Sequence, residues 1–263
     1  MSICIAICVT GIALIMCATM AAESSATTGK GAVTDKVLEL VKERDSFAGI
    51  EYILGLGEDA AVAKVFAEVM CELHSKKAIA AEIAIGRAGI QYCLTIGQTL
   101  RDKDLKRSIA MREMARQISY NLAANLWPGW AEEGVVLGSG DLATGLELAK
   151  LDLRLIEETE SPPKKRSNGH WLIGAQLIAA GQYMEALSHL ESARQYADKA
   201  ADTDHLNMIK GYIGLAEILG KRPEGKQHFD SAVAELSKSQ GEDGKFFADQ
   251  LRTASKVFAK PIP

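Results

Sequence analysis

Residues 168–201 read NGHWLIGAQLIAAGQYMEALSHLESARQYADKAA, and this stretch carries the clearest structural pattern in the chain. Both halves place apolar residues at the spacing of an amphipathic helix, and Gly181 lies at the break between them. Small residues recur where two such helices would touch, at Gly174 and Ala186, with Ala193 as a further contact. The pattern predicts an antiparallel helix pair, which cannot bury its apolar faces alone and must stack on neighbouring helices.

The stretch resembles a tetratricopeptide repeat. The resemblance rests on the spaced residues Gly174, Gly181, Tyr183, Ala186, Leu190 and Ala193. Proteins of that family are right-handed stacks of antiparallel helix pairs, so the resemblance implies an all-α superhelix, a solenoid. It also implies a scaffold for a protein or peptide partner, because the repeat motif specifies an architecture and leaves the ligand open.

The rest of the chain shows the same helical period, and no segment has the alternation of a β-strand. Helices are predicted over residues 35–45, 47–55, 58–75, 77–99, 103–126, 130–138, 141–159, 168–180, 183–200, 203–219, 224–239 and 243–259. We expect helical hairpins over 33–160 that continue into tetratricopeptide-like repeats over 168–260, with 34–45 and 243–259 as flanking caps. The segment 160–167 is predicted to be the longest loop.

A glycine recurs at the predicted breaks between helices, at Gly57, Gly140, Gly181 and Gly220. The last three are 41 and 39 residues apart. Tetratricopeptide units are about 34 residues long, and HEAT or armadillo units about 40–47. The spacing therefore predicts a degenerate array between these two kinds of repeat.

Residues 1–21 have the composition of a secretory signal peptide. No charged side chain occurs from Ser2 to Ala22, and Thr19 and Ala21 are the small residues that cleavage after Ala21 requires. Two alternatives stay open: a retained membrane anchor, since about 20 apolar residues span a bilayer, and lipid modification of Cys17. All three predict an exported protein, which is periplasmic, secreted or at the cell surface, with residues 22–32 as a flexible linker.

Composition limits the class of protein. The chain has 263 residues, of which 48% are hydrophobic and 24% charged, so it can bury a sizeable core. Its net charge of -4 argues against a nucleic-acid partner, since such proteins usually carry a basic surplus. The one compact basic run, residues 164–166, is predicted to lie in a solvated loop.

Cysteine positions argue against a disulfide. Removal of the signal peptide would leave Cys71 and Cys93. A turn near residues 75–77 places Cys71 opposite residue 81, which is about 18 Å along the helix from Cys93. A bridge needs α-carbons within about 7 Å, so both thiols are predicted to be buried core residues.

No motif for catalysis, a cofactor or a metal stands out. The five histidines form neither HExxH nor a zinc-type cluster with cysteine. Glu185 and His189 are four residues apart on one predicted helix, and we interpret them as an exposed helix pair. The Gly-Ser-Gly run at 138–140 follows no strand and is interpreted as a helix stop rather than a phosphate loop.

The tryptophans are the best candidates for a partner-binding surface. All three lie at the starts of predicted first helices, which line the groove in tetratricopeptide proteins. The resemblance implies a groove near Trp127, Trp130, Asn168, Trp171, Asn207 and Lys210. Rings with amides beside them suit a peptide. The alternative is that each tryptophan is a packing residue. We expect Trp130 to be partly exposed and Trp127 to be buried.

The sequence therefore favours a non-catalytic scaffold that mediates protein–protein or peptide binding outside the cytoplasm. A small-molecule or lipid carrier is the second hypothesis, and it would require an enclosed apolar cavity. A carbohydrate-active enzyme that uses Glu132 and Glu133 is the third. It is the weakest, because adjacent glutamates on one helix cannot flank a single glycosidic bond.

Overall fold

The computed structural model describes residues 30–159 and 161–259, and every regular element in that part of the chain is helical. The first six elements are α2 (Lys30–Glu43), α3 (Ser46–Leu54), α4 (Asp59–Ser75), α5 (Ile79–Leu100), α6 (Leu105–Asn125) and the short 3-10 helix η1 (Pro128–Trp130). The others are α7 (Ser139–Glu158), α8 (Pro163–Ala179), α9 (Tyr183–Lys199), α10 (Thr203–Leu219), α11 (Gly225–Lys238) and α12 (Glu242–Phe258). The all-α prediction is confirmed.

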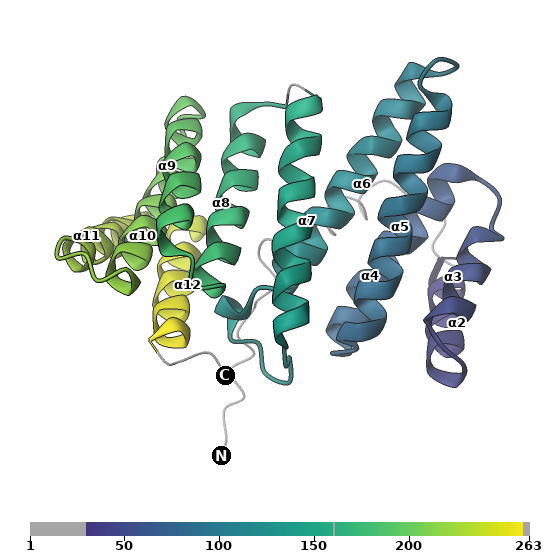
Figure 1. The fold of residues 1–263 in the computed structure, drawn as a ribbon, viewed down its shortest axis with the longest axis horizontal. Helices are drawn as coiled ribbons and strands as arrows, with labels where there is room; N and C mark the ends of the chain where they lie inside the picture. Colours follow the sequence, from purple (N-terminus) through teal and green to yellow (C-terminus); the bar gives the residue numbers. More distant parts are fainter. Residues whose placement is uncertain (1–29, 160, 260–263) are drawn as a thin grey trace.

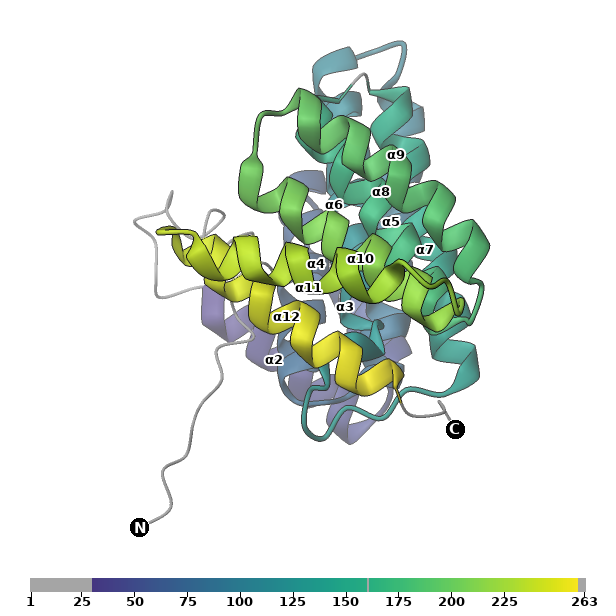
Figure 2. The same cartoon turned by 90° about the vertical axis from the view of Figure 1, so that its left-hand side faces the viewer.

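The helices form a stack in sequence order, from α2 and α3 at one end to α11 at the other (Figure 1). Each helix from α4 to α11 packs on the next, and α11 and α12 lie side by side at one end (Figure 2). The even-numbered helices also contact one another along the stack and so form one layer. The odd-numbered helices α5, α7, α9 and α11 each pack on the two even-numbered helices that precede and follow them. This is the arrangement of a helical-repeat solenoid.

The predicted signal peptide, residues 1–21, lies outside the described residues. The predicted linker over 22–32 overlaps them only at its end, where α2 already begins at Lys30. Val37 of α2 is fully buried, and the helix packs against α3 and α4, so tertiary contacts hold this helix in place.

The same turn joins three of the helix pairs. Lys77, Gly181 and Lys221 each have a left-handed backbone conformation, with φ of 59°, 72° and 59°. The amide of the following residue bonds five residues back in each case, at 2.8–2.9 Å, which is the Schellman pattern of a helix C-terminus. The predicted break at Gly181 is confirmed. Its structural equivalent in the next pair is Lys221 rather than Gly220.

Glycines let the paired helices approach closely. A β-carbon on Gly174 would lie 2.6 Å from Cγ of Leu190 and 3.4 Å from the carbonyl oxygen of Ala186, as expected from the small residues in this pair. A β-carbon on Gly214 would lie 2.4 Å from the backbone nitrogen of Phe229. The predicted break at Gly140, in contrast, lies inside α7.

Two predictions on either side of α7 are wrong, a helix over 130–138 and a loop over 160–167. Residues 131–138 are not a helix, because left-handed conformations at Ala131 (φ 52°) and Gly134 (φ 82°) interrupt the backbone. The loop predicted over 160–167 is shorter, because α8 begins at Pro163, whose fixed φ suits a first helical position. The basic residues 164–166 therefore lie in the first turn of α8.

α12 does more than cap the last pair. It packs on α10 and α11, and it also contacts η1 in the connection between α6 and α7. This contact joins parts of the chain that are far apart in sequence, which sequence periodicity could not show.

Two further features concern α4 and α5. Cys93 is buried, as predicted, whereas Cys71 is only half-buried, and no disulfide joins the two. Burial raises the pKa of Cys93 to about 12. Among the described helices, α5 alone is long and apolar enough to cross a membrane, and it packs between α4 and α6.

Candidate functional site

The three tryptophans meet in one aromatic cluster, which consists of Trp127, Trp130, Trp171, Tyr212 and Phe258. Trp127 is its centre, with ring centroids 5.0 Å from Trp130, 6.3 Å from Trp171, 5.8 Å from Tyr212 and 6.0 Å from Phe258. The indole nitrogens of Trp127 and Trp130 donate to the carbonyl oxygens of Ala175 and Ala124 at 2.9 and 2.7 Å. The cluster binds the α6–α7 connection to α8, α10 and α12.

This packing decides between the two interpretations of each ring. Trp127 and Trp171 are only 2% exposed and are core residues, whereas Trp130 is half-buried. Asn168 and Asn207 are half-buried, and Lys210 is exposed. The structure brings the three tryptophans together in a packed cluster, and Phe258 of α12 contacts Trp127 at its centre. Partner binding by Trp130, Asn168, Asn207 or Lys210 stays a prediction.

An open groove lies elsewhere, between the odd-numbered helices α5 and α7. It has a volume of about 740 Å³. α5 lines it with Arg87, Ala88, Ile90, Gln91 and Leu94, and α7 with Glu147, Leu148, Lys150, Leu151 and Arg154. α6 packs on both helices and holds them apart. The groove therefore has an apolar floor between two polar rims.

The rims of the groove carry mostly positive charge. Arg87 of α5 spans to α7, where its Nη2 lies 2.7 Å from Oε2 of Glu147. Arg154 pairs loosely with Glu158, at 3.7 Å. Lys150 is exposed and forms no ion pair with any residue that the structure describes. Three cations face one anion here, on a chain whose net charge is -4.

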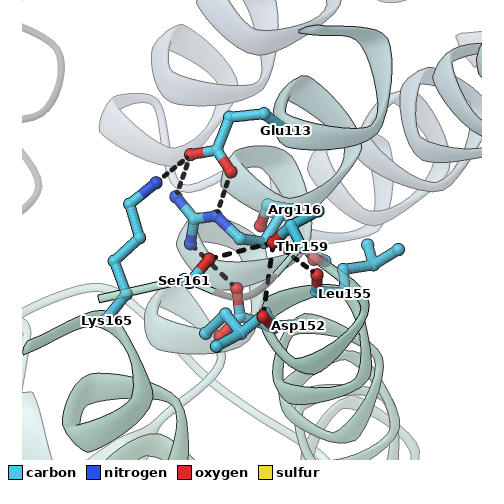
Figure 3. A network of polar contacts seen from close by, with 9 residues as sticks. Glu113, Arg116, Asp152, Leu155, Thr159, Ser161 and Lys165 are labelled. Atoms are coloured by element: carbon cyan, nitrogen blue, oxygen red, sulfur yellow. Dashed lines mark hydrogen bonds and ion pairs between the residues drawn. The ribbon is translucent and has the colours of Figure 1, made fainter. Parts of the chain in front are cut away.

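A second polar centre joins α6, α7 and α8 (Figure 3). The guanidinium of Arg116 donates two hydrogen bonds of 3.0 Å to Glu113 and one of 3.0 Å to Oδ1 of Asp152. Lys165 of the basic run donates to Glu113 at 2.7 Å. Burial alone would raise the pKa of Glu113, but these hydrogen bonds outweigh it and lower that pKa. Lys165 is thus a structural contact rather than part of a polyanion site.

The pKa of Asp152 shifts in the opposite direction to that of Glu113. Asp152 is fully buried, and its Oδ2 has no hydrogen-bond partner in the described chain. Burial raises the pKa of Asp152 to about 7, although Arg116 opposes the shift. The carboxyl group lies under α8, where a β-carbon on Gly169 would be 3.4 Å from Oδ2. The carboxyl group of Asp152 is therefore shielded from solvent.

Glu132, one of the two carboxylates considered for catalysis, is engaged in structure. The two ring nitrogens of His74 each lie 2.9 Å from a carboxylate oxygen, Nδ1 from Glu82 and Nε2 from Glu132. Lys77 pairs with the second oxygen of Glu132, and Asn125 donates to Glu82 at 2.7 Å. Glu132 and Glu133 also lie in the loop after η1, not on a helix as predicted.

A serine–histidine pair, which the sequence analysis did not single out, lies inside the fold. The hydroxyl of Ser167 donates to the carbonyl oxygen of Ala193 at 2.8 Å, and Nε2 of His205 is 2.9 Å from the same hydroxyl oxygen. Since the serine proton goes to a carbonyl, His205 donates to Ser167 rather than activating it. Burial lowers the pKa of His205 to about 4, and Ser167 is fully buried. The pair is structural.

A pair of histidines joins α8 and α9. His170 and His189 approach at 3.2 Å between their Nδ1 atoms, and burial lowers the pKa of His170 to about 4. Within residues 30–159 and 161–259, no group of three or more His, Cys, Asp or Glu side chains is placed to hold a metal ion.

The groove between α5 and α7 is thus the feature that the sequence analysis missed. Its signal in the sequence is weak: half-buried apolar residues, Leu94 and Leu151, lie beside exposed charges on two helices that are separated by α6. The chain matches no known family model and no curated protein.

Proposed function

We propose that the protein is a non-catalytic helical-repeat scaffold that binds a segment of another protein in the groove between α5 and α7. The observation that carries the proposal is this open groove of about 740 Å³, with an apolar floor and charged rims. Peptide segments bind in such sites by placing apolar side chains on the floor and polar groups on the rims. The resemblance of residues 168–201 to tetratricopeptide repeats supports the same class of function.

The chemistry of the described residues fits a scaffold better than the alternatives. The serine–histidine pair at Ser167 is buried and oriented for structure, and Glu132 is bound by His74 and Lys77. A small-molecule or lipid carrier remains the second candidate, and it would hold its ligand in an enclosed cavity, whereas the groove is open. The composition of residues 1–21 supports action outside the cytoplasm.

Site-specific photo-cross-linking tests the proposal. A photoreactive amino acid replaces Gln91, which is exposed on the rim of the groove, or Gln195, which is exposed on α9. We expect a discrete protein adduct in the exported fraction with the Gln91 variant only, and excess unmodified protein should suppress it. Equal adducts at both positions, or an adduct that is not suppressed, would contradict a specific binding groove.

A further inference from the structure

We propose that the occupant of the α5–α7 groove is an acidic amphipathic helix. The inference rests on the proposed function, because it names the partner chemistry of the same groove. Shape, backbone chemistry and charge each support it separately.

The shape of the groove suits a helix. α5 and α7 both run antiparallel to α6, so they are parallel to each other, and their separation by α6 leaves a trough between them. The lining from Arg87 to Leu94 extends for about 10 Å, or two helical turns. The floor presents half-buried side chains at Ala88, Leu94 and Leu151. A helix that binds in this trough would bury one apolar face against these three side chains. The odd-numbered helices α5 to α11 bury their own apolar faces in the same way, against the even-numbered helices next to them.

Backbone chemistry favours a helix over an extended peptide. The lining residues lie inside α5 and α7, so their own backbone groups are already used in helical hydrogen bonds. An extended peptide would need side-chain partners for its N–H and C=O groups, and only Gln91 and Glu147 in the lining carry side-chain oxygens that can accept from its N–H groups. A helix satisfies its backbone internally and needs only side-chain contacts.

Charge selects an acidic partner. Arg87, Lys150 and Arg154 line the groove, and Glu147 is its only acidic lining residue. Lys150 is the cation best placed to form a new ion pair with a partner, because it forms none within the described chain. Carboxylates on a helix above the floor would meet Lys150 and Arg154 on the α7 rim.

The test uses three fluorescent peptides of about 14 residues, which spans roughly 21 Å as a helix and so exceeds the trough. The first is an amphipathic helix with leucine on one face and glutamate on the other, the second has lysine in place of glutamate, and the third is a scrambled form of the first. Fluorescence anisotropy measures binding to the full chain. We expect the acidic helix to bind at least tenfold more tightly than the other two.

The variants locate the binding. Lys150→Glu with Arg154→Glu should weaken the acidic helix at least tenfold. Lys106→Glu with Lys245→Glu makes the same change in net charge at exposed positions outside the lining and should leave binding unchanged. Far-UV circular dichroism and the thermal midpoint of both double variants confirm that the fold is retained. Raising the salt concentration to 1 M should weaken binding, because the Debye length falls to about 3 Å.

Each opposite result has a definite meaning. Equal weakening by both double variants, or equal binding of the basic helix, would overturn the inference, since attraction would then be non-specific. If the acidic helix does not bind while the Gln91 cross-link still forms, the partner chemistry is wrong and the proposed function stands. If neither occurs, both proposals fail.

Discussion

The ring centroids of Trp127 and Phe258 lie 6.0 Å apart, although the first residue precedes η1 and the second is the last residue of α12. The contact ties the irregular α6–α7 connection to the C-terminal helix across α8 and α10. α12 therefore packs against η1 and against the Trp127 ring next to it. In a simple array of helix pairs each unit contacts only its neighbours, whereas this contact joins units that are far apart in the sequence.

The first prediction follows from that contact. Phe258→Ala should lower the free energy of unfolding by about 3–5 kcal/mol, since Phe258 is 7% exposed and its loss leaves a cavity beside Trp127. The tryptophan emission should shift to the red as water reaches the cluster. Phe47→Ala is the matched control, because Phe47 is 80% exposed. Similar denaturation midpoints for the two variants would show that α12 does not depend on this contact.

The second prediction concerns close packing in the α10–α11 pair. Gly214→Ala should destabilise the protein by about 1–3 kcal/mol, because the new methyl group would lie 2.4 Å from the backbone nitrogen of Phe229, which cannot rotate away. Gly140→Ala should instead stabilise by about 0.5–1 kcal/mol, since Gly140 lies in α7 with no atom within 4 Å of the added carbon. Urea denaturation of both variants measures the difference, and changes of the same sign would contradict this packing.

The third prediction concerns the shared turn. Gly181 and Lys221 occupy the same left-handed position in successive pairs, and that conformation costs an L-residue about 1–2 kcal/mol. Gly181→Ala should therefore destabilise, and Lys221→Gly should stabilise by up to about 1 kcal/mol. Crowding adds nothing at Gly181, because no atom lies within 4 Å of an added β-carbon. Opposite shifts of the thermal midpoint would support this equivalence, and a loss of stability in both variants would not.

These contrasts show what could be predicted from the sequence. The helix pair at 168–201 and the break at Gly181 follow from local periodicity and from the freedom of glycine to adopt a positive φ. The apolar residues of the segment 130–138 predict a helix. That prediction is wrong because Ala131 adopts a left-handed backbone conformation, which the apolar pattern does not indicate. The burial of Trp171 depends on Trp127 and Tyr212, which come from other segments, and the groove depends on the separation of α5 from α7. Neither is encoded within one segment.

The last prediction concerns pH and Asp152. Burial raises the pKa of Asp152 to about 7 in the folded protein, whereas an aspartate in an unfolded chain has a pKa near 3.9. Between these values the folded state holds a proton that the unfolded state has released. The contribution of Asp152 to stability is therefore fully present below about pH 4, and it declines as the pH rises to about 7, by at most tenfold in the unfolding constant per pH unit.

Other groups shift in the opposite direction, so a single pH curve is not enough. Burial lowers the pKa of His170 and of His205 to about 4 each, and these two residues stabilise the fold as the pH rises from about 4 to about 6.5. The lowered pKa of Glu113 affects only more acidic conditions. The difference between wild type and Asp152→Asn removes these common terms, because only Asp152 changes.

Urea denaturation of both proteins at pH 5, 6, 7 and 8 measures that difference. Asparagine keeps the shape of the side chain and an oxygen that can accept from Arg116, and it carries no charge at any pH. We expect the stability of Asp152→Asn, relative to wild type, to increase from pH 5 to pH 7 and to level off by pH 8. A difference that is constant with pH would show that Asp152 does not hold its proton, and that Arg116 outweighs burial at this carboxyl group.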